Sequence, residues 1–494
     1  MIVSNRLKNQ HLLWRSAFGP MAENAASLEK ISQKDLWKLL LKTSSKEPEK
    51  IIVAQNLVDD LYKGVKDVID QQKAMEMKED QKQLNAQQKK QMRQQSRDEL
   101  KSLNLRWLDE MINSEAQLRE KMSLFWHGHF ACRVINSYFQ QELLHTIRAN
   151  ALGNFGDLLK AVSKSPSMLQ FLNNQQNRKQ KPNENFAREV MELFTMGRGN
   201  YTEYDIKEGA RAFTGWGFNL QGEFVFRKFQ HDSDSKTFMG KTGNFNGDDI
   251  LDMLLENRKT AYFITRKIYR YFVNEDTDEE KLQWLSNRFY NSKYDIKALL
   301  TDIYTSDWFY TEKNIGTRIK SPIELLAGMR RFLPLEMDNN NAQILFQKVL
   351  GQTLFYPPNV AGWPGGKNWI DSSTLMVRLQ IPQVLSANDS ISIRPKNDDD
   401  VNMGQVMEEE VRIKKNKIYT DKGGSASIDW NIVNKIFQNT SRENLSEKIQ
   451  ETLLQTGSRI PVAVLNKYLN ADNREDFIKS AVINLMSTPE YQLC

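Results

Sequence analysis

The amino-acid sequence predicts a mainly α-helical protein with a short β-hairpin or loop insertion and a C-terminal helical subdomain. Apolar residues recur at helical spacing along most of the chain, and several of these segments begin at a capping residue. Only residues 216–247 combine glycines with alternating aromatic residues, which is the pattern of short strands. With 494 residues, the chain is long enough to bury a substantial core.

The composition divides the chain into three regions. Residues 1–385 are expected to form the main helical domain, in which residues 71–100, rich in Gln and Lys, form a solvated helix or are partly disordered. Residues 386–428 carry blocks of like charge, as a linker or insertion does. Helical spacing returns in residues 429–494, which we expect to form the C-terminal subdomain.

The central stretch, residues 182–216, predicts two helices joined by a glycine-containing turn. Asn183 is a candidate N-cap of the first helix, and Thr202 with Asp205 forms a candidate capping box for the second. On a helical wheel the first helix carries one polar stripe, made of Asn185, Arg188, Glu189 and Glu192. This stripe either faces a cleft between the helices or is a solvated helix face.

Two histidines occur in the helical segment that precedes this stretch. His129 follows Leu118, Met122 and Phe125 on one helix face, so it is predicted to point into the core, while His127 projects to the other side. A buried histidine of this kind is either a hydrogen-bonded core residue or a functional residue.

Residues 216–247 are the only region where we expect strands. Alternation through Phe224, Phe226 and Phe229 predicts a short hairpin, and His231 with Asp232 lies at its far end. An aspartate next to a histidine in sequence orients the imidazole only if the backbone turns one side chain onto the other.

A second irregular stretch, residues 350–380, is rich in proline and glycine, which exclude a regular element. It contains Asn359 and Trp363. This aromatic loop either forms the wall of a pocket or packs over the end of a helix.

The composition argues against several classes of function. Lys and Arg exceed Asp and Glu by only 68 to 62, and a nucleic-acid role would rest on the Gln/Lys-rich helix and on Arg266, Lys267 and Arg270, which are expected to face solvent or an anion. No nucleic acid is therefore expected as a partner. Two cysteines form no disulfide framework or zinc motif. Without a signal peptide or a membrane span, the sequence as written predicts a cytoplasmic protein.

Two functions compete. A hydrolase-like or metal-assisted enzyme would use imidazoles and carboxylates as general acid and base or as ligands of a divalent metal. The catalytic candidates are Glu189, Glu192, His129, His231 and Asp232, and the substrate-binding candidates are Asn185, Arg188, Trp216, Asn359 and Trp363. No GxSxG, HExxH or phosphate-binding glycine loop identifies a reaction. In the alternative, the same residues form an ion-pair network inside a protein-binding or scaffold module.

Several motifs occur in one order across nearly the whole chain: HLLWRSAFGP, EKMSLFWHGHF, NENFAREVMELFTMG, YTEYDIKEGARAFTGW, HDSDSKTFMG, IKSPIELL and LGQTLFYPPNVAGWPGGKNWIDSSTL. Together they resemble the bacterial domain of unknown function family 1800, and the closing STPEYQL is similar to the end of such proteins. The resemblance implies a large, mostly helical bacterial protein, often exported and often encoded beside a sulfatase-like or alkaline-phosphatase-like partner.

The chain departs from the family pattern at two points. Phe194 stands where the family string commonly reads histidine, which removes one candidate ligand from the central helix. No export signal precedes His11, whereas many proteins of the resembling family are exported.

Overall fold

The computed structural model describes residues 3–55, 86–337, 340–387, 426–457, 460–470 and 472–494. Over these residues the chain is mainly α-helical, as predicted, with strands only in small two-stranded antiparallel sheets. None of the helices within the described ranges has both the length and the apolar composition needed to cross a bilayer.

The first half of the chain supplies the helices that surround the candidate residues. They are α1 (Asn5–Ser16), α2 (Gln33–Thr43), α5 (Ala86–Asn113), α6 (Gln117–His129), α7 (Ser137–Asn150), α8 (Phe155–Ser163), α9 (Pro166–Phe171), α10 (Glu184–Glu189), the π-helix η4 (Val190–Thr195) and α11 (Glu203–Ala212). Asn183 caps α10 as predicted, because its side chain accepts a hydrogen bond from the Asn185 amide. The capping box of Thr202 and Asp205 at α11 is also confirmed.

The second half is helical as well. It contains α12 (Gly247–Glu256), α13 (Arg258–Phe272), α14 (Glu279–Asn291), α15 (Ile296–Tyr304), α16 (Pro322–Phe332), α17 (Asn341–Val349), α18 (Ser372–Ala387), α20 (Trp430–Ile436), α21 (Leu445–Leu453), α22 (Val462–Leu465) and α23 (Arg474–Met486). Ser321 caps α16 and Pro322 occupies its first turn, where a proline costs no hydrogen bond.

Two strand pairs lie in residues 216–247, where strands were expected. β1 (Trp216–Phe218) pairs with β2 (Phe224–Phe226), and β3 (Lys236–Phe238) pairs with β4 (Lys241–Gly243). The expectation that strands occur only there was wrong, because β5 (Leu335–Met337) pairs with β6 (Ala426–Ile428). A three-residue strand whose partner is distant in sequence has too few residues to produce a recognisable alternation.

Two regions singled out by composition are described only in part. Of the Gln/Lys-rich residues 71–100, those from 86 onward form the start of α5, while residues 71–85 lie outside the described residues. In the charged region 386–428, residues 386–387 end α18 and residues 426–428 form β6. Residues 388–425 lie outside the described part of the chain.

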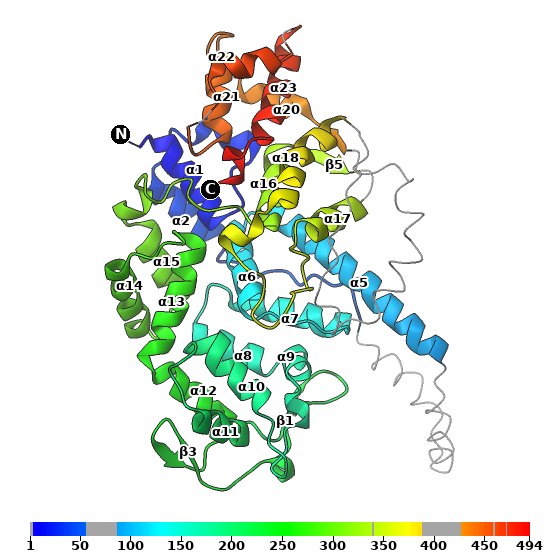
Figure 1. Ribbon diagram of the computed structural model, residues 1–494, viewed down its shortest axis with the longest axis vertical. Coiled ribbons are helices and arrows are strands. Elements are labelled where there is room, and N and C mark those ends of the chain that lie inside the picture. Colours follow the sequence, from blue (N-terminus) through cyan, green and yellow to red (C-terminus); the bar gives the residue numbers. More distant parts are fainter. Residues whose placement is uncertain (1–2, 56–85, 338–339, 388–425, 458–459, 471) are drawn as a thin grey trace.

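The molecule is elongated, with the C-terminal helices α20 to α23 at one end and the strands β1 and β3 near the other (Figure 1). A large hydrophobic cluster is built from α1, α2 and the helices α6 to α15. Another cluster joins α16, α17 and α18 to the C-terminal helices.

The N-terminal helix is bonded to the C-terminal segments. The side-chain amide of Gln10 donates hydrogen bonds to the carbonyl oxygens of Glu451 and Thr452, at 3.1 and 2.9 Å. The guanidinium of Arg15 donates to the carbonyl oxygens of Asn314 and Cys494, at 2.9 and 2.8 Å. Both donors are buried, so these bonds supply partners that water cannot.

A buried ion cluster connects α6 to α16. Glu324 forms ion pairs with Lys121 and Arg318, and all of these side chains are almost completely excluded from solvent. Burial alone would raise the pKa of Glu324, but Arg318 and Lys121 outweigh it and hold the pKa well below its usual range. Burial lowers the pKa of Lys121 to about 8.

Candidate functional site

The polar stripe predicted on the central helix crosses a change of helix type. α10 ends at Glu189 and continues as the π-helix η4, in which the Met196 amide donates to the carbonyl of Met191, five residues earlier. The Thr195 hydroxyl donates to the Val190 carbonyl at 2.7 Å. Because a π-turn holds more residues than an α-turn, a wheel drawn at 100° per residue misplaces the residues after Glu189.

Arg188 connects the two helices of the central stretch. Its guanidinium donates two hydrogen bonds to the carboxylate of Glu203 on α11, at 3.0 and 2.9 Å, and one to Glu184 at 3.1 Å. These bonds lower the pKa of Glu203. Arg188 therefore joins α10 to the start of α11.

The two glutamates of the stripe lie in different environments. Glu192 accepts a hydrogen bond from the Tyr201 hydroxyl at 3.0 Å and forms an ion pair with Arg198. Burial, and next the charge of Glu192, raise the pKa of the half-buried Glu189. The pair thus combines a carboxylate that has hydrogen-bonding partners with one whose pKa is raised.

His129 points into the core, as predicted. Its Nδ1 lies 2.9 Å from the Lys267 Nζ, and its Nε2 lies 3.2 Å from the carbonyl oxygen of Phe194. An ammonium can only donate, so Nδ1 accepts from Lys267 and the Nε2–H group donates to the carbonyl. That carbonyl lies in the last turn of η4, where no further helical amide can reach it. His129 therefore caps the end of the π-helix.

The surroundings of His129 keep it neutral. Burial, and then the charge of Lys267, hold its pKa well below the ordinary value, and burial lowers the pKa of Lys267 to about 8. The expectation that Lys267 faces solvent or an anion was wrong. Lys267 borders the apolar stripe of α13 in sequence, and its long chain reaches across that boundary to the imidazole.

His127 is buried as well, but it contacts different residues from those around His129. Its Nε2 accepts a hydrogen bond from the Phe355 amide at 3.2 Å, and its ring lies 5.1 Å from Trp107 and 5.5 Å from Trp363. Burial lowers its pKa to about 3. His127 thus connects α6 to the aromatic loop as a neutral core residue.

His231 and Asp232, adjacent in sequence, have separate partners. The His231 Nδ1 lies 2.9 Å from the Thr214 carbonyl oxygen, to which it donates, and burial lowers its pKa. Asp232 accepts hydrogen bonds from Arg211 at 2.7 and 3.3 Å. Although burial opposes it, this contact lowers the pKa of Asp232. The carboxylate therefore stabilises α11 through Arg211.

Two substrate-binding candidates of the central stretch, Trp216 and Asn185, make contacts with neighbouring helices and loops. Trp216 is buried, with its ring 5.1 Å from Phe213 and the ammonium of Lys164 at 5.4 Å from the ring centre. The side-chain amide of Asn185 donates to the Leu172 carbonyl at 3.2 Å.

The aromatic loop packs over the end of α6. Asn359 is exposed and accepts a hydrogen bond from the Ala361 amide at 2.9 Å, inside a tight turn. Gly362 adopts φ +85°, and a Cβ there would overlap the carbonyl oxygen of Gly128. The half-buried Trp363 follows, against His127. This close backbone approach fixes the loop on the helix.

The candidate residues therefore lie in separate settings. Glu189 and Glu192 border the turn at Arg198, His129 faces Lys267, and His231 and Asp232 face Thr214 and Arg211. Among the residues that the structure describes, no group of three or more His, Cys, Asp or Glu side chains is placed to hold a metal ion.

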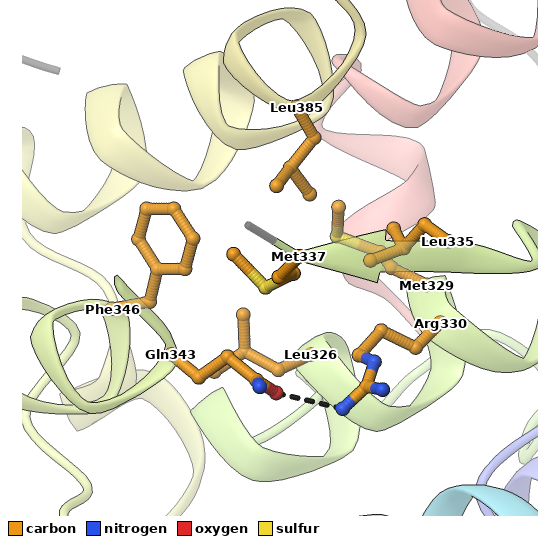
Figure 2. A pocket seen from close by; sticks show the side chains of 8 residues that line it. All are labelled: Leu326, Met329, Arg330, Leu335, Met337, Gln343, Phe346 and Leu385. Atoms are coloured by element: carbon orange, nitrogen blue, oxygen red, sulfur yellow. Dashed lines mark hydrogen bonds between the residues drawn. The ribbon is translucent and has the colours of Figure 1, made fainter. Parts of the chain in front are cut away.

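Two hollows in the described part of the chain lie away from the candidate residues. One hollow, near β5, has a volume of about 10 Å³, room for about one water molecule, and is lined by Leu326, Met329, Arg330, Leu335, Met337, Gln343, Phe346 and Leu385 (Figure 2). Another, of about 80 Å³, is lined by Arg6, Ala25, Ala26, Glu29, Ile436, Phe437, Lys448 and Thr452. Neither hollow is lined by a candidate catalytic or substrate-binding residue.

Comparison with known proteins gives the family of the chain. No curated protein and no solved structure is significantly similar to it. A family profile described as "Protein of unknown function (DUF1800)" matches residues 11–493, which is nearly the whole chain. The resemblance seen in the ordered motifs is confirmed, and the chain belongs to the DUF1800 family of proteins of unknown function.

Proposed function

We propose that this chain is a non-catalytic scaffold module that binds a partner protein. The bridge from Arg188 to Glu184 and Glu203 supports this proposal more than any other observation. That guanidinium is engaged with both helices of the central stretch, so its hydrogen-bonding groups link α10 to α11.

The other polar candidates support the same proposal. His129 caps a helix, Asp232 pairs with Arg211, and His127 accepts a backbone hydrogen bond. Separate contacts of this kind fix the side chains that make them, and a surface built on fixed side chains loses less conformational entropy when it binds. A scaffold gains affinity in this way without any catalytic group.

The proposed partner is a sulfatase-like or alkaline-phosphatase-like protein encoded nearby, as the family resemblance implies. Isothermal titration calorimetry with that purified protein tests the proposal. We expect saturable binding, and an unrelated phosphatase serves as the control. Equal heats from both proteins would contradict specific partner binding.

A hydrolase-like or metal-assisted enzyme is a second candidate, supported by the glutamate pair on α10 and η4. Glu189 has a raised pKa while Glu192 is hydrogen-bonded and ion-paired, and an acid–base pair needs such unequal environments. Elemental analysis of the natively purified wild type and of the Glu192→Ala and His129→Ala variants decides between the candidates. Stoichiometric metal that both folded variants lose would support the enzyme. Absence of metal, with both variants merely less stable to heat, would support the scaffold.

A further inference from the structure

Two segments form one surface beside the first strand pair. The Gly215 amide donates to the Asn177 carbonyl at 3.0 Å, and the Lys179 amide donates to the Gln230 carbonyl at 2.8 Å. The turn at residues 178–181 therefore lies against residues 227–230 at the Lys179–Gln230 contact. We call the exposed part of these two segments the basic–aromatic surface.

Cations dominate this surface. Its basic residues are Arg178, Lys179, Lys181, Arg227 and Lys228, and neither segment contains an acidic residue. All of them except the half-buried Arg227, which donates to the Phe218 carbonyl, are exposed. None of these cations forms an ion pair with a carboxylate of the described residues. Of the nearby carboxylates, Asp232 is paired with Arg211. Within the described part of the chain, the positive charge of this surface is therefore not neutralised by ion pairs.

Two exposed phenylalanines lie in or directly before the second segment of this surface. Phe229, next to Lys228, is 72% exposed, and Phe226 is 37% exposed. Phe226 is supported from below by the ring of His231, at 5.1 Å between ring centres. His231 in turn is fixed by its hydrogen bond to Thr214. The Phe226 ring thus packs against an imidazole that is itself fixed, while the Phe229 ring is largely exposed to solvent.

We propose that the basic–aromatic surface binds the surface of an anionic phospholipid membrane. Cationic side chains attract anionic headgroups, and aromatic rings insert at the boundary between headgroups and acyl chains. The strands beside this surface lie at one end of the long axis of the molecule, so this end can meet a flat bilayer without obstruction from the C-terminal helices (Figure 1). The inference is independent of the proposed scaffold function.

An anionic membrane fits this surface better than a protein partner or a nucleic acid does. A protein partner would need a pocket for the Phe229 ring, whereas a bilayer accommodates it without one. Binding to single-stranded nucleic acid uses several rings that stack on successive bases, and here one ring is largely exposed. The small basic excess of the whole chain also argues against generic nucleic-acid binding.

Co-sedimentation of the full chain with vesicles tests the proposal. We expect binding to vesicles of phosphatidylcholine and phosphatidylglycerol in equal parts, little binding to phosphatidylcholine alone, and release by salt. The triple variant Lys179→Glu, Lys181→Glu and Lys228→Glu should lower partitioning by at least on the order of 100-fold. The control carries Lys30→Glu, Lys34→Glu and Lys297→Glu, the same change in net charge at exposed positions elsewhere, and should bind like the wild type.

The aromatic contribution has its own variants. Phe229→Ala should weaken partitioning by on the order of ten-fold, and Phe229→Trp should restore it. Circular dichroism and thermal melting serve to check that these surface variants are folded. Equal binding to neutral and anionic vesicles, or equal loss in both triple variants, would overturn the proposal. Displacement of the vesicles by polyglutamate or an oligonucleotide at lower concentration would assign the surface to another class of anion.

Discussion

Lys267 donates a hydrogen bond to His129 across 2.9 Å, and this contact determines the protonation of the imidazole. The ammonium keeps Nδ1 as an acceptor, so the only ring proton is on Nε2, where it bonds the Phe194 carbonyl. A positive charge next to the end of a helix is also favoured by the helix dipole. Lys267 and His129 therefore stabilise the end of η4, which lies within the central stretch, residues 182–216.

Replacing His129 by alanine should destabilise the fold strongly. The variant loses a ring packed among aromatic residues and leaves the Phe194 carbonyl and the Lys267 ammonium without their partner. We expect a loss of about 3–5 kcal/mol in the free energy of unfolding, measured by urea denaturation. His145→Ala, at a half-buried position, is the control and should cost much less. Similar losses in both variants would contradict the capping role.

Replacing Lys267 by methionine should change how stability depends on pH. The pKa of Lys267 is about 8 in the folded protein and about 10.4 when unfolded, so between these values the unfolded chain binds more protons. The free energy of unfolding therefore rises as pH increases through this window. Between about pH 7 and pH 9, we expect this residue to contribute about 1 kcal/mol of the wild-type rise. Urea denaturation at both pH values should give a smaller rise for Lys267→Met, and an unchanged rise would contradict the assignment.

Glu324→Gln should be among the most destabilising polar substitutions. It leaves the charges of Lys121 and Arg318 buried without their carboxylate, which costs about 3–5 kcal/mol. Adding Lys121→Met removes one of these charges, so the double variant should lose less stability than the sum of the single losses. A double-mutant cycle by urea denaturation measures this coupling. Strict additivity would show that the two side chains do not interact.

Gly362→Ala should destabilise the aromatic loop. The residue has φ +85°, and the new methyl group would overlap the Gly128 carbonyl. We expect a loss of at least about 2 kcal/mol, measured by thermal or urea unfolding. Gly351→Ala is the matched control, because Gly351 has φ +87° and no atom lies within 4 Å of a Cβ there. If both variants lose the same stability, the close approach of Gly362 to the Gly128 carbonyl does not determine the stability of the loop.

Phe194→His restores the histidine that the family string commonly contains. The Phe194 ring lies 5.9 Å from the His129 ring and is buried, so the new imidazole would replace apolar contacts without an assured hydrogen bond. We expect a loss of about 2–3 kcal/mol and no bound metal, because the Lys267 ammonium already occupies the Nδ1 of His129. Stoichiometric metal in the purified variant would contradict this and would show that Phe194 replaces a ligand.

Local signals made much of the fold predictable. The caps at Asn183 and Thr202 are side-chain patterns within three residues of a helix start, and they were correct. The β5–β6 pair and the turn of Lys267 toward His129 were missed, because each depends on a partner far away in sequence. Periodicity identifies which face is apolar, but it does not identify the neighbouring element.

The candidate site was harder to predict than the fold. The sequence indicated which polar residues lie near aromatic or glycine-rich segments, but their partners depend on helix type and packing. The π-turn after Glu189 rotates the residues that follow, and no local pattern announced it. Asp232 likewise faces Arg211, which lies on α11, although His231 is its neighbour in sequence.

The bonds of α1 have a consequence for synthesis on the ribosome. Gln10 and Arg15 emerge early, but their acceptors at Glu451, Thr452 and Cys494 are separated from them by more than 440 residues of chain. Until those residues are translated, Gln10 lacks both of these acceptors and Arg15 has only the earlier Asn314 carbonyl, while the apolar face of α1 lacks its full cover. A nascent chain that stalls before residue 451 should therefore expose this helix to chaperones and proteases, and its release should allow the final step of folding.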